Sequence, residues 1–137
     1  PTQTLLVSSA FRTIGAWVVC ATPFRASVTA LRRNLHWLPI RERVTYKIAV
    51  MTLKVRLHHT PAYLDELIVS HAPTRLMRSA DKDLLVTRRT KTLIASRAFG
   101  AAAPVIWNSL PVNIRSATSM DVFRSKLKAH LSGVAYD

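Results

Sequence analysis

The chain of 137 residues is 49% hydrophobic and 20% charged, so it is long enough to bury one core and too short for two ordinary domains. Its 20 Lys and Arg against 7 Asp and Glu give a net charge of +13, and such an excess attracts polyanions, of which nucleic acid is the commonest. The single cysteine, Cys20, excludes an internal disulfide and a cysteine-rich zinc site. No apolar run reaches the roughly 20 residues of a membrane-spanning helix, so no membrane partner is expected. Because the sequence begins at Pro1 and not at Met, we expect residues 1–137 to be one module of a longer protein.

The first segment, residues 4–21, is apolar but has a poor helical period. It predicts a helix or a buried segment that needs a partner. Pro23 then interrupts the chain, and Ser27 is suited to cap a short helix that ends near Asn34.

The clearest predicted helix begins at Pro39, because proline suits the first helical position. A second helix is predicted to begin at Pro61, where the first one ends. Apolar residues recur along the first helix at intervals of three and four, which predicts one buried stripe: Ile40, Val44, Ile48, Met51 and Val55.

The chain becomes basic and irregular over residues 72–95, where Leu84, Leu85 and Val86 favour a brief strand. A short helix from about Arg97 is then predicted to be interrupted by Pro104.

The last predicted helix is capped by Ser119 and buries one line of apolar residues: Phe123, Leu127 and Leu131. The predicted fold class is therefore mainly α. It comprises about five or six helices with at most one short strand or hairpin near residues 84–90.

Two tryptophan-proline cassettes, LHWLPI and APVIWNSLPVNIR, place Trp just ahead of Leu-Pro. Trp is the largest apolar side chain and carries one N–H donor, so beside a rigid proline it is typical of a joint between segments. We therefore predict four structural anchors: Trp37, Pro39, Trp107 and Pro111.

The order of these motifs resembles the region downstream of the polymerase domain in non-LTR retrotransposons, the LINE elements of the jockey and chicken-repeat kind. The resemblance covers residues 22–131, whereas residues 1–21 match that pattern poorly. Besides the two cassettes, it is carried by Arg43, Tyr46, Lys47, Ile48, Pro61, Tyr63, Leu64, Leu67, Pro73, Arg75, Leu76, Arg78, Ser79, Arg97, Ala98, Phe99, Ile114, Arg115, Ser119, Phe123, Lys126, Leu127, Lys128, His130 and Leu131.

The resemblance implies a C-terminal fragment of a reverse transcriptase, the RNA-directed DNA polymerase of a transposable element, with the upstream polymerase domain as a partner. That polymerase holds two metal ions on an aromatic-Ala-Asp-Asp turn, which this sequence lacks. The fragment is therefore expected to be inactive alone, without a metal, a cofactor or a small-molecule substrate. The resemblance also implies an intracellular location, cytoplasmic and nuclear, with the retrotransposon particle.

The acidic and histidine pairs do not predict a metal site. Asp81 and Asp83 have no third carboxylate at a useful spacing, so a solvated loop is the better interpretation. His58 and His59 are adjacent and cannot both face one ion from a regular helix, and His36 is interpreted as a packed or capping residue.

Ser109 does not predict a nucleophile, because it lacks the glycines of a nucleophile elbow. Together with Asn108 it is expected to form hydrogen bonds in the turn before Pro111.

The densest positive stretch lies within residues 72–100. We predict that it binds the phosphate backbone of RNA or DNA, because Arg is suited to bidentate contacts with phosphate. Reading of the base sequence is not predicted, because aromatic residues make up only 7% of the chain and are interpreted as core anchors. The predicted contacts are Arg75, Arg78, Arg88, Arg89, Lys91 and Arg97.

Two alternatives stay open at this point. In the first, the chain is a structural helical cap that packs on the polymerase thumb, and its charge serves solubility. The apolar stretch from Leu5 to Val19 is then expected to make the isolated chain associate nonspecifically. In the second, the chain is a nonfunctional transposon remnant.

Overall fold

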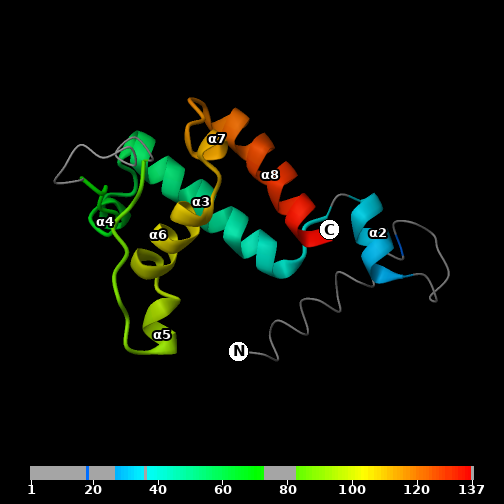
Figure 1. Cartoon of the computed structure of the whole chain (residues 1–137), viewed down its shortest axis with the longest axis horizontal. Coiled ribbons are helices and arrows are strands. Elements are labelled where there is room, and N and C mark those ends of the chain that lie inside the picture. The colour runs from blue at the N-terminus through cyan, green and yellow to red at the C-terminus, as the bar shows by residue number, and fades with distance from the viewer. Residues whose placement is uncertain (1–17, 19–26, 36, 73–82, 137) are drawn as a thin grey trace. The chain divides into compact units, whose positions relative to one another are not determined.

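The computed structural model describes residue 18 and residues 27–35, 37–72 and 83–136 (Figure 1). Seven helices lie in these described ranges, three of them single turns of four residues. The predicted mainly α fold is confirmed, with slightly more helices than the expected five or six. The helices are α2 (Val28–Asn34), α3 (Ile40–His58), α4 (Ala62–Asp65), α5 (Leu93–Ser96), α6 (Phe99–Ser109), α7 (Val112–Arg115) and α8 (Met120–Tyr136).

The brief strand predicted near residues 84–90 is reduced to an isolated antiparallel bridge between Ser70 and Leu85. Two backbone hydrogen bonds flank it. The N–H of His71 donates to the carbonyl of Leu84 at 2.8 Å, and the N–H of Val86 donates to the carbonyl of Val69 at 2.9 Å.

The chain divides into two compact units. The first unit comprises Pro1–Val44 and Lys128–Asp137, and the second comprises Thr45–Leu127. Both α3 and α8 contribute residues to each unit. The expectation that residues 1–137 form a single module of a longer protein stays a prediction.

The core of the second unit is built around Trp107 and Phe123, whose side chains are fully buried. Their rings stack with centroids 5.8 Å apart and 20° between the planes, which adds an aromatic attraction to the burial of area. The other buried side chains around them are mostly apolar: Ala49, Thr52, Leu53, Val55, Leu85, Ala101, Ala103, Pro104, Leu110, Ile114 and Leu127.

The buried stripe predicted for α3 is wrong at most of its positions. Val44 is 50% exposed and Met51 39% exposed, and of the five predicted residues only Val55 is buried. The face that packs inward instead carries Ala49, Thr52 and Leu53. Burial of Thr52 is tolerated because its hydroxyl donates to the carbonyl of Ile48 at 2.8 Å.

The predicted interruption of α6 at Pro104 is also wrong, because the helix continues through this residue to Ser109. Pro104 has no N–H to donate to the preceding turn, which costs a helix interior about 3 kcal/mol. The helix persists because Pro104 itself is fully buried, together with Ala103 and Trp107 on the same element.

The prediction for the last helix is confirmed. Ser119 precedes α8, and its hydroxyl accepts a hydrogen bond from the N–H of Val122 at 3.3 Å, as an N-cap does. The predicted line of Phe123, Leu127 and Leu131 is buried throughout.

In the first unit, Tyr136 of α8 contacts Trp37 of the first tryptophan-proline cassette. The hydroxyl of Tyr136 donates to the carbonyl of Trp37. The guanidinium of Arg33 donates to the carbonyl of Tyr136 and lies over its ring at 5.6 Å from the centroid. Leu38 and Leu131 are buried in this unit. Along the described residues, no helix combines the length and the apolar character that crossing a membrane requires.

Candidate nucleic-acid interface

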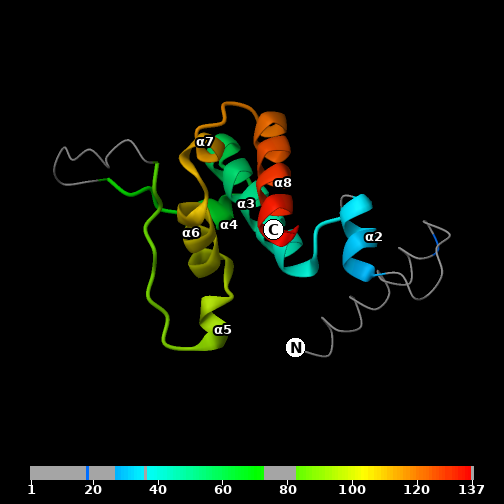
Figure 2. The same cartoon turned by 45° about the vertical axis from the view of Figure 1, so that its right-hand side comes forward.

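The predicted phosphate contacts separate into two groups. Arg88, Arg89, Lys91 and Arg97 lie on residues 86–98, which we call the basic segment, and all four side chains are exposed. Arg75 and Arg78 lie outside the described residues. In both views the basic segment passes beside α6 and turns into α5, at the end of the unit opposite α7 (Figures 1 and 2).

The basic segment itself carries positive charges and no negative one. No acidic residue lies between Asp83 and Asp121 in the sequence. The three ion pairs seen in the described ranges involve Arg56, His59 and Arg124, and none of the four cations of the basic segment. Their charge is therefore neutralised by water and counterions, which a polyanion can replace.

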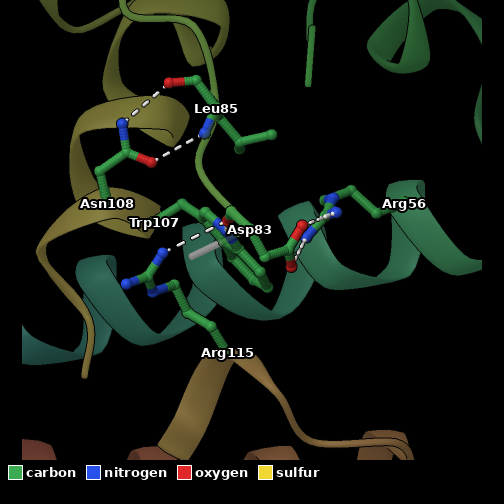
Figure 3. Close-up of polar contacts among 6 residues, drawn as sticks. All are labelled: Arg56, Asp83, Leu85, Trp107, Asn108 and Arg115. Carbon is green, nitrogen blue, oxygen red and sulfur yellow. Dashed lines mark hydrogen bonds and ion pairs between the residues drawn. The ribbon is translucent and has the colours of Figure 1, made fainter. Parts of the chain in front are cut away.

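The chain just before the basic segment is fixed at Asp83, whose backbone has a φ of 49°. Asp is one of the few non-glycine residues that adopt this left-handed conformation. Its carbonyl accepts two hydrogen bonds, one from the indole N–H of Trp107 at 2.9 Å and one from the guanidinium of Arg115 at 3.3 Å (Figure 3). The second tryptophan cassette therefore holds the backbone from which the basic segment begins.

The side chain of Asp83 is held from the opposite side by Arg56 of α3. Its two carboxylate oxygens accept from the two terminal nitrogens of Arg56 at 2.5 and 2.6 Å, a bidentate pair (Figure 3). The same guanidinium lies over the ring of Trp107, 4.9 Å from its centroid, at the distance of a cation–π contact. Trp107 therefore binds the carbonyl of Asp83 and also contacts Arg56, the ion-pair partner of the Asp83 carboxylate.

Asn108 fixes the residue directly before the basic segment by binding the backbone of Leu85 (Figure 3). Its carbonyl oxygen accepts from the N–H of Leu85 at 2.9 Å, and its amide nitrogen donates to the carbonyl of Leu85 at 2.8 Å. The Asn108 amide therefore makes the two hydrogen bonds that a neighbouring strand would make with Leu85. Leu85 also forms the antiparallel bridge to Ser70.

These contacts extend one prediction and correct another. Asp83 lies in an exposed loop, as expected, and it also forms the anchor just described, while Asp81 lies outside the described residues. Asn108 was expected to bond within the turn before Pro111, but its partner is Leu85. The hydroxyl of Ser109 donates to the carbonyl of Ile106 at 2.7 Å, within α6 itself.

The four predicted anchors occupy different positions. Trp107 is fully buried, and Trp37 is half-buried, with its carbonyl bound by Tyr136. Pro39 directly precedes α3, where its carbonyl accepts from the N–H of Arg43, and Pro111 directly precedes α7. Each proline thus lies where one helix begins.

The histidines and carboxylates form no metal centre in the described part of the chain, where no group of three such residues comes together. His59 contacts the carboxylate of Asp65 at 2.9 Å on an exposed surface. His36 lies outside the described residues. The predicted absence of a cofactor stays a prediction.

No protein-family model matches this chain, and no match is found among curated proteins or solved structures.

Proposed function

We propose that the chain is a non-catalytic module that binds the phosphate backbone of RNA or DNA through the basic segment. The observation that carries the proposal is the exposure of Arg88, Arg89, Lys91 and Arg97 on one segment that contains no acidic residue. Arg and Lys that replace condensed cations on phosphates release those cations, which drives binding.

The anchoring of the segment supports the proposal. The backbone at residues 83–85 is bound by Trp107, Asn108 and Arg115. A segment held at its start loses less conformational entropy when its side chains bind a ligand than a free basic tail does. The fixed start therefore favours a binding role for these charges over one in solubility alone.

The resemblance to the region downstream of a retrotransposon polymerase supports the choice of RNA or DNA as the polyanion. In this proposal the parent is an RNA-directed DNA polymerase, and the module holds template RNA or target DNA near the upstream domain. The module performs no reaction of its own.

The test is a salt titration of binding to duplex DNA and to single-stranded RNA of equal length. The logarithm of the binding constant is expected to fall linearly with the logarithm of the salt concentration. Replacing Arg88, Arg89, Lys91 and Arg97 with Gln is expected to make the slope for duplex DNA shallower by about 3 to 4, since each phosphate contact contributes about 0.9.

A matched control removes four positive charges from α3 instead of the basic segment. Arg41, Arg43, Lys47 and Lys54 are exposed on α3, and their replacement with Gln lowers the net charge equally. The control is expected to change the slope much less than the basic-segment variant does. A slope near zero for the wild-type chain would exclude the proposal, and equal slopes for the two variants would exclude the assignment to the basic segment.

A further inference from the structure

Two large apolar side chains project from the middle of the basic segment. Leu93 is 82% exposed and Ile94 is 84% exposed. Both belong to α5, which both views place at one end of the second unit (Figures 1 and 2). They are the most exposed large apolar residues of the described ranges, and such exposure marks an interaction site when it is rimmed by polar residues.

The turn that carries these side chains is stabilised by its own hydrogen bonds. The hydroxyl of Thr92 accepts from the N–H of Ala95 at 3.2 Å and caps the start of α5. The hydroxyl of Ser96 donates to the carbonyl of Leu93 at 2.8 Å. The two apolar side chains are therefore presented from an ordered turn.

Cations precede and follow the apolar pair. Lys91 lies two residues before Leu93, and Arg97 lies one helical turn after it, so Arg97 shares a face with the pair. The nearest acidic residues in sequence are Asp83 and Asp121. An occupant of this surface must offer both negative charge and an apolar face close together.

We infer that Leu93 and Ile94 form a wedge that inserts between neighbouring bases of the nucleic acid held by the basic segment. This inference rests on the proposed function. A nucleic acid presents phosphates for the flanking cations and apolar base faces between them, and Leu and Ile are among the residues that separate base steps in this way. The basic segment contains no aromatic residue, so an aliphatic wedge replaces the aromatic stacking of other binding modules.

The test uses RNA and DNA duplexes that carry one 2-aminopurine, a base whose fluorescence rises when it loses its stacking. The full chain is expected to increase the fluorescence on binding. The Leu93→Ser, Ile94→Ser variant is expected to lose this increase in fluorescence. Its binding is expected to depend on the salt concentration as steeply as that of the wild type. The control replaces Val112 and Val122, two exposed apolar residues of the same unit, with Ser, and is expected to keep the increase.

The outcomes separate the wedge from the proposed function. If the wild-type chain binds with a steep salt dependence but leaves the fluorescence unchanged, the wedge is overturned and phosphate binding stands. If it does not bind at all, both fail. The same proteins are mixed with vesicles of phosphatidylserine and phosphatidylcholine. Vesicle binding that requires Leu93 and Ile94, without a fluorescence change on the duplexes, would assign the pair to a membrane surface and overturn the wedge.

Discussion

Trp107 and Asn108 are adjacent in sequence but bind different residues of one extended segment. The indole of Trp107 donates to Asp83, and the amide of Asn108 binds both backbone groups of Leu85. The sequence predicted that Trp107 is an anchor, because a large apolar residue with one donor beside a proline favours burial. It did not predict the partners, because they lie 23 and 24 residues away along the chain, where only the tertiary fold brings them close.

Replacing Asn108 with Ala is expected to lower the free energy of unfolding by about 2 kcal/mol, since it leaves the N–H and the carbonyl of the buried Leu85 without a side-chain partner. It is also expected to weaken nucleic-acid binding, because the start of the basic segment is released. Urea denaturation followed by circular dichroism measures the first effect, and the salt titration at low salt measures the second.

The control for this variant is Asn113→Ala, an exposed asparagine on α7. Its effect is expected to stay within about 0.5 kcal/mol, as is usual for surface positions. An Asn108→Ala variant as stable as this control would show that the two hydrogen bonds contribute little to stability.

At the scale of elements, the sequence predicted the cap and the buried face of α8 but not the buried face of α3. Ser119 is confirmed as a cap, and Phe123, Leu127 and Leu131 are confirmed as buried, since their spacing of four places them on one face of α8. Apolar residues lie on several sides of α3, and the packed face uses the smaller Ala49 and Thr52. Periodicity cannot choose among several apolar faces, since the neighbours in the fold decide which one is covered.

The cap of α8 provides a prediction at this scale. Replacing Ser119 with Ala is expected to lower the free energy of unfolding by about 1 kcal/mol, because the N–H of Val122 loses its acceptor at the start of the helix. The matched control is Ser125→Ala at an exposed position within α8, where Ala is the better helix former and stability is expected to rise slightly. Thermal unfolding of both variants checks the pair, and equal losses of stability would contradict the capping role.

At the scale of the whole chain, the composition carries more of the proposal for a binding surface than any single motif does. The net charge of +13 indicates a polyanionic ligand, and four of the six predicted contacts lie exposed on one segment. The composition could not locate the apolar pair of α5, because Leu93 and Ile94 look like ordinary core residues in a sequence. Their exposure follows from the packing of the other helices, which leaves this single turn uncovered.

The contact between Tyr136 and Trp37 joins residues 99 positions apart, and the burial of Tyr136 makes stability depend on alkaline pH. Burial is the main cause that raises the pKa of the Tyr136 phenol above its ordinary value of 10.0; Glu42 raises it further, while Arg32 and Arg33 oppose the shift. Below pH 10 the phenol is neutral in the folded and unfolded chains, so its stabilising effect is complete. Above pH 10 the unfolded chain ionises first, so this contribution decreases as the pH rises through the folded pKa.

Replacing Tyr136 with Phe removes both the hydrogen bond to Trp37 and this titration. At pH 8 the variant is expected to be less stable than the wild type by about 1 kcal/mol, the usual net value of one hydrogen bond. As the pH rises above 10 the difference is expected to shrink, because only the wild type loses the contribution of Tyr136, whereas the lysines and the other tyrosines titrate in both proteins. Urea denaturation between pH 8 and 11 measures the two curves. Curves that stay parallel over this range would show that the Tyr136 phenol ionises equally readily in the folded and unfolded chains.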